Sequence, residues 1–391
     1  MEQVELLLLI ASLVAIMSRR IRLPYTIGLV LAGLGLSLIG VDFTIHLSKE
    51  LIFSVLLPPL IFEAAFHLRW RDLKAELPVA LTMATLGVAL AAVASSAMLI
   101  LFAGQSWQTA IIIGVVMAAT DPVSILALLK ESKLPPRIHR LIEAESILND
   151  GTAAVLFTLA LSVIAGSVSA GQFLTLSLTA VCFGLVIGAA IGLVALVIAG
   201  RTEDHLVELA VTTVAAYASF ILAEDLHASG VLATLAAGMV LGNLGTKGAI
   251  TEKGHESTEA FWEFAGFVSN SIIFLLIGAD LTLWRSGVTN SLVLWTIIAS
   301  ITSRAVAVYV GCLPLAVLKQ RVPLPIQNLL FFGGLRGALA LALVLGLPPE
   351  IPARDEIVSA VFLAVAFSVV VQGLTAGRVI ARSTDRLKGY E

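Results

Sequence analysis

Long uncharged runs follow one another along nearly the whole chain, and one of them extends without a charged residue from 173 to 200. A helix rises about 1.5 Å per residue and the hydrocarbon core of a bilayer is roughly 30 Å thick, so about 20 apolar residues cross it. Of the 391 residues, 58% are hydrophobic and only 13% are charged. The sequence therefore predicts an all-α polytopic membrane protein.

Glycine and proline clusters and short charged gaps divide the chain into thirteen apolar segments. Their approximate bounds are 3–17, 24–40, 51–68, 78–103, 108–129, 143–165, 172–200, 206–223, 228–243, 258–283, 290–317, 324–347 and 356–376. The basic residues test this count, because cytoplasmic loops collect Lys and Arg. With the N-terminus outside, the outer gaps hold only Lys49, Arg285 and Arg354. We therefore expect about thirteen transmembrane helices, an external N-terminus and a cytoplasmic C-terminus.

Two helix-interrupting stretches lie seven segments apart. The fifth segment contains AATDPVS at 118–124, and the twelfth contains FFGGLRGALA at 331–340. An odd number of segments allows two inverted repeats, and transporters built in this way bind their substrates at mid-membrane between broken helices. The sequence thus predicts inverted repeats with breaks in the fifth and twelfth helices.

Several function classes fit this sequence poorly. A net charge of −3 leaves no basic face for nucleic acid. Cys182 and Cys312 lie inside apolar runs, which argues against a disulfide framework and a Cys-based metal site. The chain has no GxxxxGK(S/T), GxSxG or HExxH motif. A membrane aspartyl protease is a remote alternative, since Pro follows Asp121 and no Gly-x-Gly-Asp surrounds Asp150. We expect neither enzymatic activity nor a cofactor.

Charged residues inside the apolar segments each need a partner or a function, because one charge at the bilayer centre costs about 3 kcal/mol on insertion scales. The candidates are Glu63, Asp121, Glu145, Asp150, Glu208, Arg304 and Arg336. The acids outnumber the bases, which favours a cation as ligand. We expect Glu208 to have an interfacial or helix-packing role and Arg304 to pair with Glu145. Arg336, near two glycines, is expected either to snorkel or to bind the carbonyls of half-helices.

The sixth segment presents two oxygen-bearing faces. Ser146 and Asp150 are four residues apart on one helical face, and Glu145 and Asn149 share the adjacent face. Carboxylate and hydroxyl oxygens are hard ligands, suited to a small cation such as Na⁺ and ill suited to soft metals. A polar cluster that only holds helices together is the alternative interpretation of this pattern.

The fifth segment adds Thr120 and Asp121 directly before Pro122. Proline lacks an N–H group and frees nearby carbonyls, and freed carbonyls at membrane depth need a cavity, an ion or another partner. A simple proline kink, with Thr120 and Asp121 capping the second half-helix, is compatible with an ion site. In the third segment Glu63 follows two prolines, and an amide such as Asn149 would suit it as a partner.

Seven motifs, in order along almost the whole chain, resemble those of sodium/proton antiporters of the NhaP and NHE type, in the monovalent cation:proton antiporter-1 family. They are LLPPLIFEAAF (56–66), TDPV (120–123), EAESILNDGTA (143–153), SGVLATLAAGMVLG (229–242), FLLIGADL (274–281), GGLRGALAL (333–341) and VVVQGLT (369–375). One departure is Ala144, where the family usually has Gly.

The resemblance implies a single transporter unit over 1–391. It would contain a six-helix core at 78–165 plus 290–376 and a dimerisation domain at 1–68 plus 172–283. The broken helices would cross at the ion site. We accordingly expect a homodimer in a prokaryotic cell membrane, with the lipid bilayer as surroundings and no nucleic-acid partner.

The resemblance also implies residue roles. Asp150 would bind Na⁺ and H⁺ in turn. Three neighbours would complete the Na⁺ shell, namely Asp121, Ser146 and the carbonyl of Thr120. The supporting residues would be Asn149 in contact with Glu63, Glu145 paired with Arg304, and Arg336 and Pro122.

We expect one Na⁺, with Li⁺ as a further candidate, to exchange for one H⁺ by alternating access. The resemblance implies that family members with Asp-Asp at this pair and a nearby Lys move net charge, whereas Asn149 cannot ionise. The exchange should therefore be electroneutral. A K⁺/H⁺ antiporter shares every motif, and a cation channel with the same polar groups is a more distant alternative.

Overall fold

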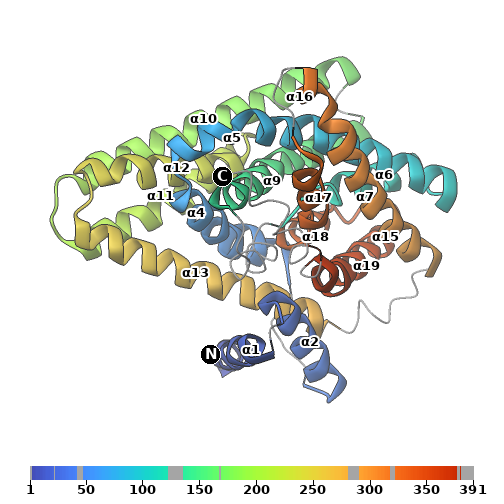
Figure 1. Cartoon of the computed structure of the whole chain (residues 1–391), viewed down its shortest axis with the longest axis horizontal. Coiled ribbons are helices and arrows are strands. Elements are labelled where there is room, and N and C mark those ends of the chain that lie inside the picture. The colour runs from blue at the N-terminus through green and yellow to red at the C-terminus, as the bar shows by residue number, and fades with distance from the viewer. Residues whose placement is uncertain are drawn as a thin grey trace. The chain divides into compact units, whose positions relative to one another are not determined.

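The computed structural model describes residues 2–21, 23–41, 47–121, 135–166, 169–280, 290–317, 322–376 and 379, and its secondary structure over these ranges is helical. The α-helices are α1 (Glu2–Ile21), α2 (Tyr25–Leu38), α3 (Lys49–Leu51), α4 (Leu57–His67), α5 (Trp70–Thr82), α6 (Val88–Ala103), α7 (Trp107–Val116), α9 (Pro136–Ile164), α10 (Ala170–Ala199), α11 (His205–Asp225), α12 (Gly230–Leu244), α13 (Glu252–Ala279), α15 (Asn290–Ala305), α16 (Leu313–Val317), α17 (Leu324–Gly333), α18 (Ala338–Leu345) and α19 (Arg354–Phe367) (Figure 1).

Within the described ranges, eight helical stretches are long and apolar enough to cross a membrane. They are Lys49–His67, Leu73–Ala103, Pro136–Ile164, Gly171–Ala199, His205–Asp225, Glu252–Ala279, Ser291–Ala316 and Arg354–Ala376. The bent pair of α17 and α18 adds a ninth candidate, and α2, α7 and α12 are shorter apolar helices. The all-helical, multi-pass architecture is confirmed, and the count of thirteen crossings and the positions of the termini stay predictions.

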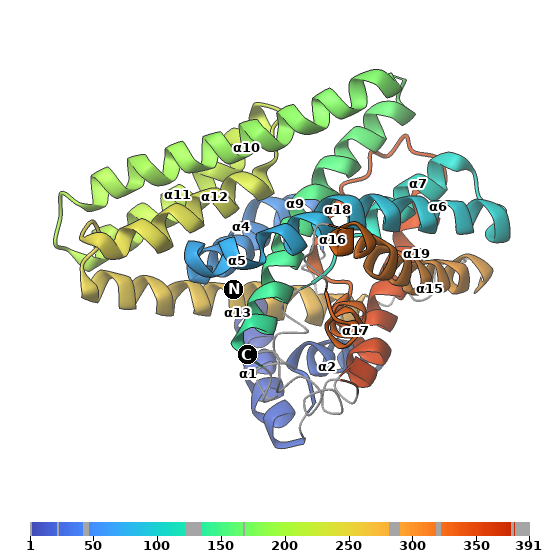
Figure 2. The same ribbon diagram turned by 45° about the horizontal axis from the view of Figure 1, so that its top comes forward.

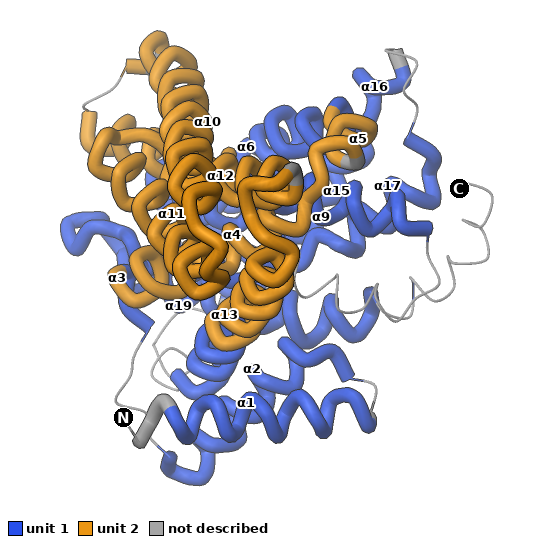
Figure 3. The backbone as a smooth tube through the Cα atoms, turned by 90° about the vertical axis from the view of Figure 1, so that its left-hand side faces the viewer, with its two compact units in different colours: residues 1–49, 78–149, 270–391 blue, residues 50–77, 150–269 orange. Residues whose placement is uncertain are grey.

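The chain divides into two compact units (Figure 3). The first unit comprises residues 1–49, 78–149 and 270–391, and the second comprises 50–77 and 150–269. The units are defined only by which backbone segments lie close together. The functional division into core and dimerisation domains therefore stays a prediction.

In the second unit, α12 packs against α4, α10 and α11, and Figures 1 and 2 both show α10, α11 and α12 running alongside one another. Small residues make this packing close. A methyl group at Gly188 would overlap the carbonyl of Ala233, and one at Gly242 would overlap the carbonyl of Phe66. An aromatic core fills the same unit, where the rings of Phe62 and Trp262 have centroids 4.4 Å apart. Glycine contacts and aromatic packing thus hold the interior of this unit together.

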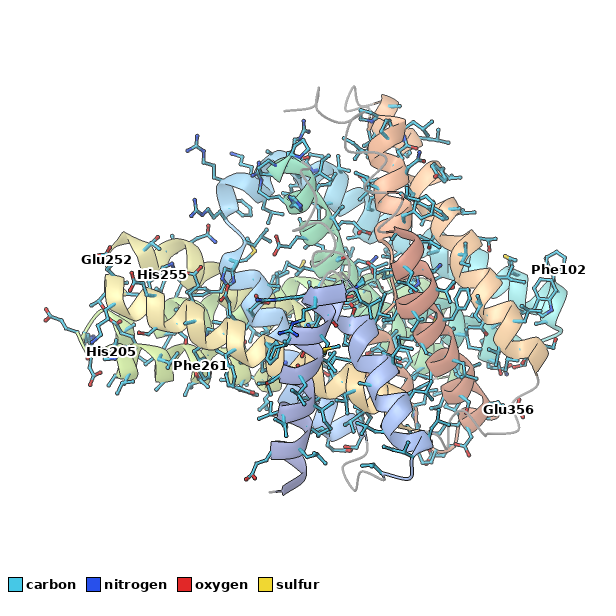
Figure 4. All side chains as sticks on the ribbon, turned by 60° about the horizontal axis from the view of Figure 1, so that its bottom comes forward. Phe102, His205, Glu252, His255, Phe261 and Glu356 are labelled. Carbon is cyan, nitrogen blue, oxygen red and sulfur yellow. The ribbon has the colours of Figure 1, made fainter. Side chains whose placement is uncertain are left out.

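Glu208 lies fully buried on α11 and binds the start of α13. Its carboxylate accepts hydrogen bonds from the backbone N–H and the hydroxyl of Thr251, at 3.0 and 2.8 Å. An acid at a helix N-terminus satisfies free N–H groups and complements the helix dipole. Figure 4 shows His205 and Glu252, the first residues of the two helices, at the same end of the unit. The predicted helix-packing role of Glu208 is therefore observed.

In the first unit, α2 and the last turns of α13 approach at two glycines. A methyl group at Gly33 would overlap the carbonyl of Leu275, and one at Gly278 would overlap the carbonyl of Val30. Helices in membranes associate through such small residues, because they let two backbones touch.

Replacing Gly33 by Leu should therefore destabilise the protein by about 1–3 kcal/mol, the usual cost of forcing extra atoms into a close-packed contact. Thermal unfolding in detergent measures this change. The matched control is Gly35→Leu on the same helix, where a Cβ would meet no atom within 4 Å. Equal unfolding temperatures for the two variants would show that the α2–α13 contact is not tight.

Candidate functional site

Helix α9 is continuous from Pro136 to Ile164 and carries the predicted ligands of the sixth segment. Glu145, Ser146 and Asn149 are buried, and Asp150 is half-buried. Because the helix has no break over these residues, Ser146 and Asp150 lie on one face, one turn apart. The arrangement of the two oxygen-bearing faces follows the predicted one.

Helix α7 ends at Val116, and residues 117–121 continue as non-helical backbone. Two turn hydrogen bonds close the helix, from Met117 N–H to the Ile113 carbonyl at 2.8 Å and from Ala118 N–H to the Val115 carbonyl at 3.1 Å. Pro122, which we predicted to cause the break, lies outside the described residues.

An interruption separates α17 from α18, whose axes are bent by 47°. The non-helical residues between them, 334–337, lie directly against Asp121, the last described residue of the non-helical stretch 117–121. Asp121 donates its backbone N–H to the carbonyl of Leu335 at 2.7 Å. A methyl group at Gly337 would overlap the Asp121 side chain, so only glycine allows this approach. The two non-helical stretches that the sequence singled out are thus in contact within the first unit.

Two of the residues predicted as cation ligands, Thr120 and Ser146, touch here through their hydroxyl groups, whereas the predicted ligand of Thr120 is its carbonyl. The hydroxyl oxygens of Thr120 and Ser146 are 3.1 Å apart. Thr120 is 2% exposed, Ser146 is 0% exposed and Asp121 is 6% exposed. A cluster of buried hydroxyl and carboxylate oxygens can bind a hard cation.

The ion pair expected between Glu145 and Arg304 is present. Arg304 donates from Nη1 to Glu145 Oε1 at 2.9 Å and from Nη2 to Oε2 at 3.3 Å. Its Nε and Nη2 also donate to the carbonyl of Leu330, at 3.2 and 2.7 Å. The amide of Asn149 donates to Glu145 at 3.4 Å. Such a bidentate pair compensates both buried charges.

Arg336 binds carbonyls, which was one of its two predicted roles. It is 1% exposed, so the alternative of snorkelling to the interface is wrong. Its Nη1 donates to the carbonyls of Ala118 and Ala119 at 3.2 and 3.0 Å, and its Nη2 donates to the carbonyl of Ser300 at 3.2 Å. A guanidinium at the C-terminal end of α7 complements the negative end of the helix dipole.

Sequence reasoning missed the partners that hold this arginine. The backbone N–H of Arg336 donates to the Ser368 hydroxyl at 3.0 Å, and that hydroxyl bonds in turn to Gln372. Gln372 belongs to the motif at 369–375, so the sequence could have indicated it as a partner. The carbonyls of Ala118, Ala119 and Ser300 are backbone groups, and no residue type in the sequence identifies them.

Glu63 belongs to the second unit and lies beside His67 on α4. The His67 ring bonds to the Glu63 carbonyl at 2.8 Å and approaches the Glu63 carboxylate at 3.9 Å. The other ring nitrogen lies 3.3 Å from Glu259 on α13. A contact between Glu63 and Asn149 would join the two units, and it stays a prediction. Over the described ranges, no group of three or more His, Cys, Asp or Glu residues is placed to hold a metal.

Comparison with known proteins gives consistent matches along the chain. The family model for the transmembrane part of sodium/hydrogen exchangers matches residues 7–382. The Na⁺/H⁺ antiporter ApNhaP of Aphanothece halophytica is 37% identical over 380 residues, covering 95% of this chain and 72% of that protein. The low-affinity Na⁺/H⁺ antiporter NhaS1 of Synechocystis is 37% identical over 396 residues, covering 97% and 74%.

A solved structure shows the same fold. The sodium proton antiporter MjNhaP1 from Methanocaldococcus jannaschii superposes with a TM-score of 0.81 at 18% identity, covering 99% of this chain and 98% of that one. The helical architecture and the match over 7–382 agree with this likeness. The chain belongs to the sodium/hydrogen exchanger family.

Proposed function

We propose that the protein exchanges one Na⁺ for one H⁺ across a prokaryotic cell membrane, with both cations competing for the Asp150 carboxylate. Its membership of the exchanger family supports cation/proton exchange, and its relatives are named as Na⁺/H⁺ antiporters. The observation that carries the residue assignment is the position of Asp150 on α9, one turn after Ser146 on the same helical face. The hydroxyl of Ser146 in turn touches that of Thr120, next to Asp121.

The proposed Na⁺ shell combines Asp150 with Asp121, Ser146 and the carbonyl of Thr120. Residues four apart on a helix have Cβ atoms about 5–6 Å from each other, so Asp150 extends the face that begins with Ser146. Ser146 in turn touches Thr120. These donors are all oxygen atoms, which is the ligand type that alkali and other hard cations prefer.

The coupling follows from the charge of the site. An empty Asp150 carboxylate is negative and costly to move through a region of low dielectric constant. Binding either H⁺ or Na⁺ leaves the same net charge, so each loaded form can change its access from one side of the membrane to the other. Because only the loaded forms change their access, exchange of the two ions is obligatory. We propose a homodimer of this chain as the assembly in the membrane.

Electroneutrality is tested in proteoliposomes carrying an outward Na⁺ gradient. We expect internal acidification without a membrane potential in a voltage-sensitive dye, because Asn149 supplies no second proton-binding carboxylate beside Asp150. A potential that appears without an added ionophore would contradict the one-to-one stoichiometry. Repeating the assay in the same vesicles with Li⁺, Na⁺ or K⁺ gradients identifies the preferred cation. A cation flux that does not respond to the opposing proton gradient would indicate a channel.

A further inference from the structure

A cavity of about 290 Å³ lies within the first unit, between α15, α17 and the helical stretch Arg354–Ala376. Three phenylalanines, Phe331, Phe332 and Phe367, form much of its wall, together with Ile301 and Val371. Figures 1 and 2 both show α15, α17 and α19 close together. The volume is at the lower end of the roughly 300–1,000 Å³ typical of small-ligand pockets.

Three polar groups in the wall already have hydrogen-bond partners. The Ser300 hydroxyl donates to the carbonyl of Ile297 at 2.9 Å, and the Thr375 hydroxyl donates to the carbonyl of Gln372 at 2.8 Å. The side-chain oxygen of Gln372 accepts from Ser368. A buried water needs about 2–4 polar partners, and this wall offers few. The cavity therefore favours an apolar occupant over water.

The charge in the wall also argues for an uncharged occupant. Arg304 borders the cavity, and its charge is compensated by the bidentate contact with Glu145. An anion would find the guanidinium already paired, and a cation would be repelled by it. The apolar wall of the cavity therefore differs from the proposed cation site, whose ligands are oxygen atoms.

The rim of the cavity lies in a membrane-spanning stretch. Val371 is 43% exposed, and Thr375 one turn later is also exposed. Both belong to Arg354–Ala376, a stretch with mean hydropathy 2.4 that is long enough to cross the bilayer. In a chain that crosses the bilayer several times, we expect an exposed side chain on such an apolar stretch to face lipid, and hydrocarbon chains are then the ligand in greatest supply at the rim.

We infer that the cavity binds one acyl chain of a membrane lipid. The chain lies along the phenylalanine wall and reaches Gly334, the first residue of the interruption between α17 and α18. Because the cavity touches this interruption, acyl-chain length and saturation should influence the exchange rate, and this second statement rests on the proposed function.

Photocrosslinking tests the binding without reference to transport. The full-length protein is reconstituted with a phosphatidylcholine that carries a diazirine near the end of one acyl chain, irradiated and mapped by mass spectrometry. We expect labelling on peptides that contain Phe331, Phe332 and Val371. Val371→Trp, which fills the rim, should reduce this labelling about tenfold, the change expected when roughly one decade of affinity is lost.

The matched control is Leu374→Trp, an equally exposed position on the same stretch that does not line the cavity. It should leave the labelling of Phe331 and Phe332 unchanged. Equal labelling in wild type and both Trp variants would overturn the proposal, as would wild-type labelling confined to outward-facing residues such as Leu374. A free diazirine-bearing alkane that labels the cavity while the phospholipid does not would assign it to small hydrophobic molecules and also overturn it.

Discussion

Replacing Asp150 by Asn should reduce Na⁺-driven proton exchange to the level of protein-free liposomes. An amide resembles the carboxylate in size, but it neither releases a proton nor supplies the negative charge that a Na⁺ ion needs. The same variant should lose the increase in thermal stability that Na⁺ gives to the wild type, because a ligand stabilises a protein only by binding its folded state.

Asp225→Asn is the matched control for this substitution. Asp225 is an exposed acid at the end of α11, and its removal should leave both the flux and the Na⁺-dependent stabilisation unchanged. Substantial exchange by the Asp150 variant would remove that residue from the central role. Loss of exchange with full Na⁺-dependent stabilisation would instead place the bound Na⁺ on other residues.

Glu145→Gln should be among the most destabilising single substitutions in the chain. It leaves the buried Arg304 guanidinium facing a neutral amide, and breaking a buried ion pair from one side costs about 3–5 kcal/mol. Thermal unfolding of the purified protein measures the loss. The control is Glu256→Gln, an exposed acid on α13, which should unfold within experimental error of the wild type.

A double-mutant cycle separates the ion pair from other effects at these two positions. Combining Glu145→Gln with Arg304→Gln removes both charges, so the double variant should be markedly more stable than the sum of the two single losses predicts. Strict additivity would mean that the two side chains do not depend on each other, despite their contact at 2.9 Å.

The most predictable parts of this protein are those fixed by helical periodicity and by the cost of burying charge. The spacing of Ser146 and Asp150 sets their common face as soon as the segment is helical. Arg304 sits in an apolar run and needed an acid, and Glu145 satisfies it. The same reasoning placed two interruptions seven segments apart, and the structure brings the residues at 117–121 and 334–337 together.

The less predictable parts depend on contacts of backbone groups. Almost every residue has the same backbone groups, so the sequence does not show which of them form a contact. Arg336 is held by three carbonyls. From the sequence alone, an arginine near glycines is equally compatible with a guanidinium group that reaches water. The steric need for Gly337 arises only because Asp121 packs on it. Helix α7 ends at Val116, two residues before the interruption predicted at 118–124, and residues 122–129 of that segment lie outside the described residues. Hydropathy identifies which residues avoid water, and it does not report where the helical hydrogen bonds end.

The two buried guanidinium groups have a consequence for motion. Arg304 links α15 to α9 and to the end of α17, and Arg336 links the loop before α18 to the stretch after α7, to α15 and to the helical continuation of α19. Pulling any of these segments away would strand a charged group in a dry interior. We therefore expect these segments to keep their mutual spacing during the proposed alternation of access and to move as one rigid body, with the hinges in other stretches of the chain.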